Sequence, residues 1–151
     1  ELGVVGNLTE SWEISAGVST MDTEVKRGLA NQNGLPITWS PDFTFTSWTT
    51  YRTPFGLSIG GGFRYVDSMI RPVSTNPNNP PPPPEQTNMR TIPDYWVVDA
   101  MLAYAVNEKV SLQLNAYNLT DEFYVASLNN SGARYSPGQP RSALLTVNFQ
   151  F

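Results

Sequence analysis

Apolar and polar side chains alternate one by one along most of this chain, and this alternation limits what the chain can fold into. Between Trp12 and Ser19, each apolar residue is followed by a charged or small residue. Successive side chains of a β-strand point to opposite faces, so this period is typical of a strand with one apolar face. Helical periodicity is not sustained anywhere in the sequence. An all-β fold is therefore predicted.

The alternating segments are separated by turn residues, which divides the chain into antiparallel strands. Six complete strands are predicted, and Glu1–Gly6 is expected to be the end of a seventh strand whose earlier part is missing. The complete segments are Trp12–Ser19, Asp42–Thr53, Leu57–Tyr65, Tyr95–Val106, Val110–Tyr117 and Arg141–Phe151.

The connections between these segments alternate between short and long. The short ones are Leu8–Ser11, Pro54–Gly56 and Asn107–Lys109, and the long ones are about Gly28–Pro41, Pro72–Thr91 and Leu128–Gln139. Antiparallel strands with short turns at one end and long loops at the other are typical of outer-membrane barrels. The short turns of such barrels are periplasmic and the long loops extracellular.

A soluble β-sandwich also alternates apolar and polar residues, so the pattern alone does not separate the two folds. Low charge (15%), aromatic residues near strand ends and small polar residues on the second face favour the membrane. No apolar run approaches the roughly 18 residues of a membrane-spanning helix. We expect interfacial aromatic girdles from Trp12, Phe43, Tyr51, Tyr65, Trp96 and Tyr104, and a lipid-facing band that includes Leu112, Leu114, Leu145 and Val147.

Composition argues against several other functions. The chain has no cysteine and no histidine, which excludes disulfides, thiolate chemistry, His-based catalysis and most zinc sites within it. Its net charge is −4 and its nine basic residues are scattered, so nucleic-acid binding is not expected. We expect a protein that is not an enzyme.

The last third of the chain carries residues specific enough to name a family. The segments Tyr95–Ala100, Leu112–Asp121 and Pro137–Arg141, with the terminal Phe151, together resemble TonB-dependent siderophore receptors, most of all the catecholate type. Earlier segments, Leu8–Gly17 and Gly60–Val66, fit the strand and turn pattern of the same family. The resemblance thus covers nearly the whole chain.

The resemblance implies a roughly 22-stranded transmembrane barrel filled by a plug, which imports ferric siderophore across the bacterial outer membrane with energy from the TonB complex. Residues 1–151 are then expected to be the C-terminal segment of the barrel domain, about its last seven strands, with the plug and the TonB-binding part absent. No cofactor is expected, since iron travels as ferric siderophore. Membrane lipid and the barrel-assembly machinery are the other partners implied.

Ferric catecholates are anionic, so extracellular arginine and aromatic side chains are candidate ligand contacts. These are Arg71, Arg90, Arg134 and Tyr135, each of which has solvated or loop-structuring roles as its alternative. Phe149 and Phe151 resemble the C-terminal signal read by the barrel-assembly machinery, with lipid contact as the alternative.

Three further segments carry expectations. Pro80–Pro84 is expected to be a stiff spacer that holds a loop away from the barrel rim. Asn118–Tyr124 is expected to continue a strand beyond the membrane. Asp99 is predicted to face the lumen and to form a structural hydrogen bond there.

Other classes of protein remain open at this point. A passive outer-membrane pore is the main alternative, and an upstream plug and TonB-binding box would decide against it. An outer-membrane enzyme would need a catalytic group in strands outside this chain. A soluble β-sandwich binding module would stay monodisperse without detergent.

Overall fold

The computed structural model describes residues 1–28, 32–73, 78 and 80–150. Within them, seven antiparallel strands form one sheet in which each strand is paired with the next in the order β1-β2-β3-β4-β7-β8-β11. Their bounds are β1 Leu2–Thr9, β2 Trp12–Thr20, β3 Phe43–Arg52, β4 Leu57–Val66, β7 Tyr95–Asn107, β8 Val110–Tyr117 and β11 Ser142–Phe149. None of the described residues forms a helix long and apolar enough to cross a membrane.

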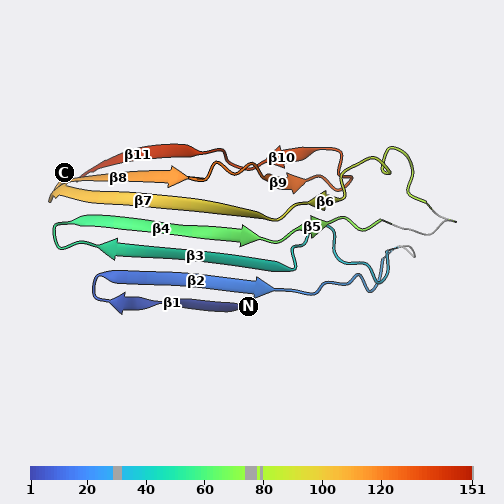
Figure 1. Cartoon of the computed structure of the whole chain (residues 1–151), viewed down its shortest axis with the longest axis horizontal. Helices are drawn as coiled ribbons and strands as arrows, with labels where there is room; N and C mark the ends of the chain where they lie inside the picture. The colour runs from blue at the N-terminus through green and yellow to red at the C-terminus, as the bar shows by residue number, and fades with distance from the viewer. Residues whose placement is uncertain (29–31, 74–77, 79, 151) are drawn as a thin grey trace.

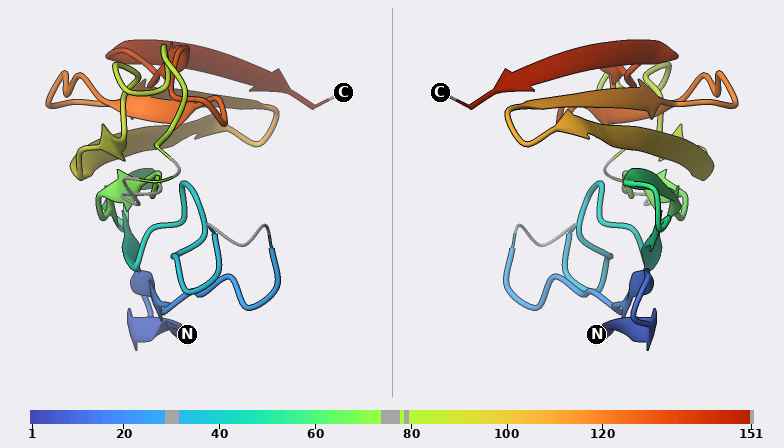
Figure 2. Two further views of the ribbon diagram at one scale, coloured as in Figure 1. Left: turned by 90° about the vertical axis from the view of Figure 1, so that its right-hand side faces the viewer. Right: turned by 90° about the vertical axis from the view of Figure 1, so that its left-hand side faces the viewer.

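Short turns lie at one end of the sheet and long loops at the other, as predicted (Figure 1). The long loops are residues 21–42, 67–94 and 118–141, called here the first, second and third long loops. The sheet is strongly twisted: seen along its strands, β1 to β4 appear nearly end on while β7, β8 and β11 appear lengthwise (Figure 2).

Two small ladders lie within the long loops and were not predicted. β5 (Met69–Ile70) pairs with β6 (Thr91–Ile92), and β9 (Val125–Leu128) pairs with β10 (Tyr135–Pro137). Ladders this short are too brief for an alternating pattern to mark them in a sequence.

The structure corrects two further expectations. β1 continues past Gly6, the expected end of this strand, to Thr9, because Asn7 and Thr9 still pair with β2. The expected continuation of a strand through Asn118–Tyr124 is wrong, since β8 ends at Tyr117. Asn118 has a φ of 50° and Asp121 a φ of 56°, and this left-handed backbone turns the chain away from the strand direction.

The strand register places the predicted lipid-facing residues on one face, called here the outer face. Leu114 lies between Leu102 on β7 and Leu145 on β11, and Leu112 is paired with Val147. Leu102, Leu114 and Leu145 are exposed in the isolated chain, from 38% to 62%. The predicted apolar band is therefore one continuous patch across three strands.

Aromatic residues border this outer face at both ends, as predicted. Near the long loops, rings lie side by side across β3, β4 and β7, with centroids 4.6 Å apart for Tyr65 and Trp96 and 6.0 Å for Phe43 and Tyr65. Near the short turns, Trp12 is paired with Tyr51, and Tyr104 lies on the same face. Two aromatic rows thus flank the aliphatic band, the arrangement of an interfacial girdle.

The opposite, inner face is lined mainly by small and polar residues, and one large ring lies flat against it. The indole of Trp48 packs over Gly60 and Gly62 of β4, where a Cβ on Gly60 would approach it to 3.0 Å. A Cβ on Gly62 would overlap the carbonyl oxygen of Ser47. The glycines therefore allow β3 and its indole to lie close to β4.

Gly62→Ala is expected to destabilise the full-length protein by about 1–3 kcal/mol, because the added methyl group must push backbone atoms apart. The neighbouring Gly61→Ala is the matched control, since its Cβ would lie 3.5 Å from the carbonyl oxygen of Asp99, an ordinary contact distance. Urea-induced unfolding in lipid vesicles measures both. Equal midpoints for the two variants would contradict this account of the Gly62 contact.

Candidate functional site

The three long loops share a small apolar core at the end of the sheet. Met69, Ile92 and Leu128 are buried in it, Ile92 completely, and Trp39 of the first loop packs against them. The short strands β5, β6 and β9 each contribute one of these side chains, and the indole of Trp39 packs against this group. The core holds all three loops in one arrangement.

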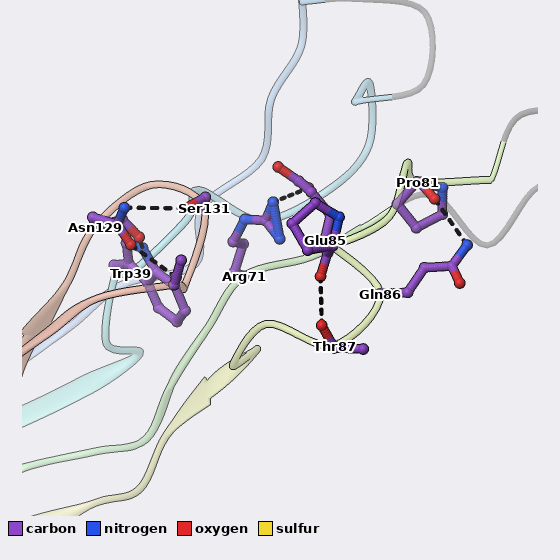
Figure 3. Close-up of polar contacts among 10 residues, drawn as sticks. Trp39, Arg71, Pro81, Glu85, Gln86, Thr87, Asn129 and Ser131 are labelled. Carbon is purple, nitrogen blue, oxygen red and sulfur yellow. Dashed lines mark hydrogen bonds and ion pairs between the residues drawn. The ribbon is translucent and has the colours of Figure 1, made fainter.

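Hydrogen bonds to backbone carbonyls also join the loops to one another. Trp39 donates its backbone N–H to the carbonyl of Ile70 (3.0 Å), and its indole Nε1 donates to the carbonyl of Asn129 (3.1 Å). The N–H of Met89 donates to the carbonyl of Gly132 (3.1 Å). Figure 3 shows Trp39 against Asn129, with Arg71 nearby. These bonds fix the second loop relative to the first and third loops.

The predicted ligand contacts all lie in these loops but are not equivalent. The N–H of Arg71 donates to the carbonyl of Arg90 (2.8 Å), so these two residues are neighbours. Arg134 donates its backbone N–H to Oδ1 of Asn129 (3.0 Å). Arg90 and Arg134 are exposed, and Tyr135 at the start of β10 is 55% exposed. All four candidates therefore lie in one loop cluster. Among the described residues, no side chain of one candidate contacts the side chain of another.

Arg71 differs from the other candidates because it is only 8% exposed. Its Nη2 forms an ion pair with Oε2 of Glu85, and its Nη1 is shielded from solvent without a hydrogen-bond partner among the described residues. Glu85 is held in a turn by the bond from its N–H to the carbonyl of Pro82 (2.8 Å). The guanidinium is thus a buried cation with one unused donor group.

A cavity of about 440 Å³ lies beside this ion pair and is lined by all three long loops. Gln32 and Thr38 come from the first loop, Arg71 and Glu85 from the second, and Asn130 from the third. Drug-sized ligands occupy cavities of roughly 300–1,000 Å³. The cavity combines this size with polar groups and one guanidinium.

The proline run, which was predicted to be a stiff spacer, forms part of this cavity. Residues 80–82 line one wall, and the chain turns at residues 83–87, where the N–H of Thr87 donates to the carbonyl of Pro84 (2.9 Å). Nε2 of Gln86 donates back to the carbonyl of Pro81 (3.0 Å), a bond drawn in Figure 3. The run therefore supports the loop that carries Glu85.

A second polar cluster fastens the third long loop to the inner face. Asn118, 1% exposed, donates from Nδ2 to the carbonyls of Glu122 and Gln139 (2.9 Å each) and accepts the N–H of Glu122 (2.9 Å). Its own N–H donates to Oδ1 of Asp99 (2.8 Å), which confirms a structural hydrogen bond for Asp99. The ring of Tyr124 stacks on Tyr95 at 4.3 Å.

Phe149, one of the two predicted assembly residues, lies at the short-turn end of the sheet. Phe149 ends β11, is paired with Val110 and is 64% exposed on the outer face. Phe151 lies outside the described residues. The recognition role of both remains a prediction.

Sequence reasoning missed Glu85, Trp39 and Asn118 as organising residues. Glu85 is the only acidic residue between Pro72 and Thr91, which was a usable signal for a partner of Arg71. The position of Trp39, with a φ of 59°, has no comparable sequence signal.

No group of three acidic side chains arranged as a metal site occurs in the described part of the chain. The arrangement offers hydrogen-bond donors and a cation for an anionic ligand.

The fold agrees with comparisons to known proteins. A model of the TonB-dependent receptor-like β-barrel family matches residues 1–119. The chain therefore belongs to the TonB-dependent receptor family and forms part of its outer-membrane barrel.

Among individual relatives, the catecholate siderophore receptor Fiu of Escherichia coli K12 is 37% identical over the whole chain, which covers 19% of that protein. A crystal structure of Fiu in a closed form superposes with a TM-score of 0.80 over 99% of this chain and 20% of that one, at 37% identity. The crystal structure of the siderophore receptor PiuA of Acinetobacter baumannii superposes with a TM-score of 0.78 at 31% identity. The match covers 97% of this chain and 20% of PiuA. The chain spans about a fifth of the length of these relatives.

Proposed function

We propose that this chain is the C-terminal segment of the barrel of a receptor that imports ferric siderophores across the outer membrane. The observation that carries the proposal is the 37% identity to a catecholate siderophore receptor along the entire chain. The loop cavity with its buried guanidinium supports an anionic ligand at the same end of the sheet. Iron is the cargo, and the chain itself performs no chemical conversion.

The remaining parts of the receptor belong to the same proposal. A plug preceding the barrel supplies the TonB contact and much of the ligand surface. Phe149 and Phe151 are read by the barrel-assembly machinery, and the outer face then meets lipid. The exposed Arg90, Arg134 and Tyr135 contribute ligand contacts at the rim of the loop cluster.

Growth of an iron-starved strain tests the proposed import. The strain lacks the full-length receptor and its other ferric-catecholate receptors, and ferric siderophores are offered one at a time. We expect the restored gene to allow growth on ferric catecholates and to fail when TonB is inactivated. No rescue by any catecholate would overturn the substrate class. Rescue that persists without TonB would instead indicate a passive pore.

A further inference from the structure

The ion pair of Arg71 and Glu85 lies where the three long loops meet, and it leaves part of the cation unused. Nη2 contacts Glu85, whereas Nη1 is shielded from water with no partner among the described residues. A buried donor without a partner is costly, so native structures rarely retain one without a reason. A ligand oxygen that accepts a hydrogen bond from Nη1 would satisfy this donor and remove its desolvation penalty.

The residues around the pair fit a ligand better than a purely structural contact. Gln32, Thr38 and Asn130 bring further polar groups to the cavity, and the prolines at 80–82 provide a stiff apolar wall. The backbone N–H of Arg71 donates to the carbonyl of Arg90 (2.8 Å). This bond and the contacts between the loops fix the position of Arg71. A preorganised cation of this kind loses little entropy on binding.

From this geometry we propose that the Arg71 guanidinium binds an anionic oxygen of the ligand, and that Glu85 occupies the same guanidinium until the ligand displaces it. The proposal rests on the proposed function, because a ferric catecholate is the anion expected at this end of the barrel. Guanidinium groups pair with paired oxygens through two parallel hydrogen bonds, and the adjacent oxygens of a catecholate can accept both. Glu85 is therefore a competitor of the ligand.

The two partners of the pair are expected to respond in opposite directions. Arg71→Gln removes the cation and should weaken ligand binding about ten- to a hundredfold, the usual effect of losing a hydrogen bond to a charged group. Glu85→Gln removes the competing carboxylate and should leave binding unchanged or make it tighter. A pair with only a structural role would weaken binding to a similar extent in both variants.

The experiment uses purified full-length receptor in detergent, with iron(III) tris-catecholate as the probe and quenching of tryptophan fluorescence as the readout. Arg27→Gln is the matched control, since it makes the same charge change at an exposed arginine of the first loop that does not line the cavity. The double variant Arg71→Gln/Glu85→Gln leaves no lone charge buried, and it should bind as weakly as Arg71→Gln. This double variant therefore still tests the role of Arg71 if Arg71→Gln alone folds poorly.

The outcomes separate the two proposals. If the unaltered receptor does not bind the probe, the proposed substrate class fails. If it binds, and Arg71→Gln binds equally well, the role of Arg71 is wrong while the import function stands. Equal weakening by Arg71→Gln and Glu85→Gln would also overturn the displacement model. Weakening by Arg71→Gln and by the double variant, but not by Glu85→Gln or Arg27→Gln, supports it.

Discussion

Replacing Asn118 by alanine is expected to release the third long loop from the inner face of the barrel. The side chain satisfies the N–H and carbonyl of Glu122 and the carbonyl of Gln139, which lies 21 residues away in the chain. Each polar group left unpaired in a buried place costs about 1–3 kcal/mol. Alanine also tolerates the positive φ of this position less well than asparagine. We expect a total loss of about 3–4 kcal/mol.

Limited proteolysis of the full-length receptor measures this loss, because cleavage follows the population of the locally opened form. A loss of about 3 kcal/mol raises that population roughly a hundredfold. Cleavage between residues 118 and 141 should increase accordingly. Asn115→Ala is the control, since its Oδ1 accepts a single bond from Gln113 on the inner face and should not change the rate.

A second variant separates the two causes of this effect. Asn118→Gly adopts the positive φ without strain but still lacks the side-chain hydrogen bonds. It should be cleaved nearly as fast as Asn118→Ala if the hydrogen bonds dominate. Cleavage of Asn118→Ala at the rate of the unaltered receptor would contradict the assigned role of this residue.

The sheet was largely predictable from sequence because its determinants are local. Alternation assigns each residue to a face, and short turns such as Pro54–Gly56 leave little freedom in the register of neighbouring strands. The pairing of Leu102 with Leu114 follows from these two facts, whereas Leu145 pairs with Leu114 across the third long loop. The apolar residues of the alternating pattern then indicated which face meets lipid.

The loop cluster was not predictable in the same way because its contacts join distant residues. Trp39 bonds to Asn129, 90 residues away, and no periodic pattern links the two. The four proposed ligand residues were chosen by residue type, which does not distinguish the buried Arg71 from the exposed Arg90. The cavity arises only where three irregular segments meet. Burial and ion pairing there depend on loop conformation, which the strand pattern does not encode.

Placing a charge on the outer face is expected to be almost as damaging as opening the third loop. Leu114 lies in the middle of β8, on the aliphatic band between the two aromatic rows. In Leu114→Arg, a cation must either enter the hydrocarbon or bend toward the membrane surface. Arginine at the midplane of a lipid-facing barrel strand costs about 2–4 kcal/mol. Urea-induced unfolding of the full-length receptor in lipid vesicles should show a loss of this size.

The adjacent residue provides the control for this prediction. Gln113 has a similar size but points to the inner face, where its Nε2 donates to Asn115 (3.0 Å) among other polar residues. Gln113→Arg should therefore cost less than about 1 kcal/mol, because its charge stays in a polar environment. The loss from Leu114→Arg should also shrink in detergent micelles, which deform around a charge more easily than a bilayer. Equal urea midpoints for the two variants in vesicles would contradict the assignment of the outer face to lipid, and a larger loss for Gln113→Arg would reverse it.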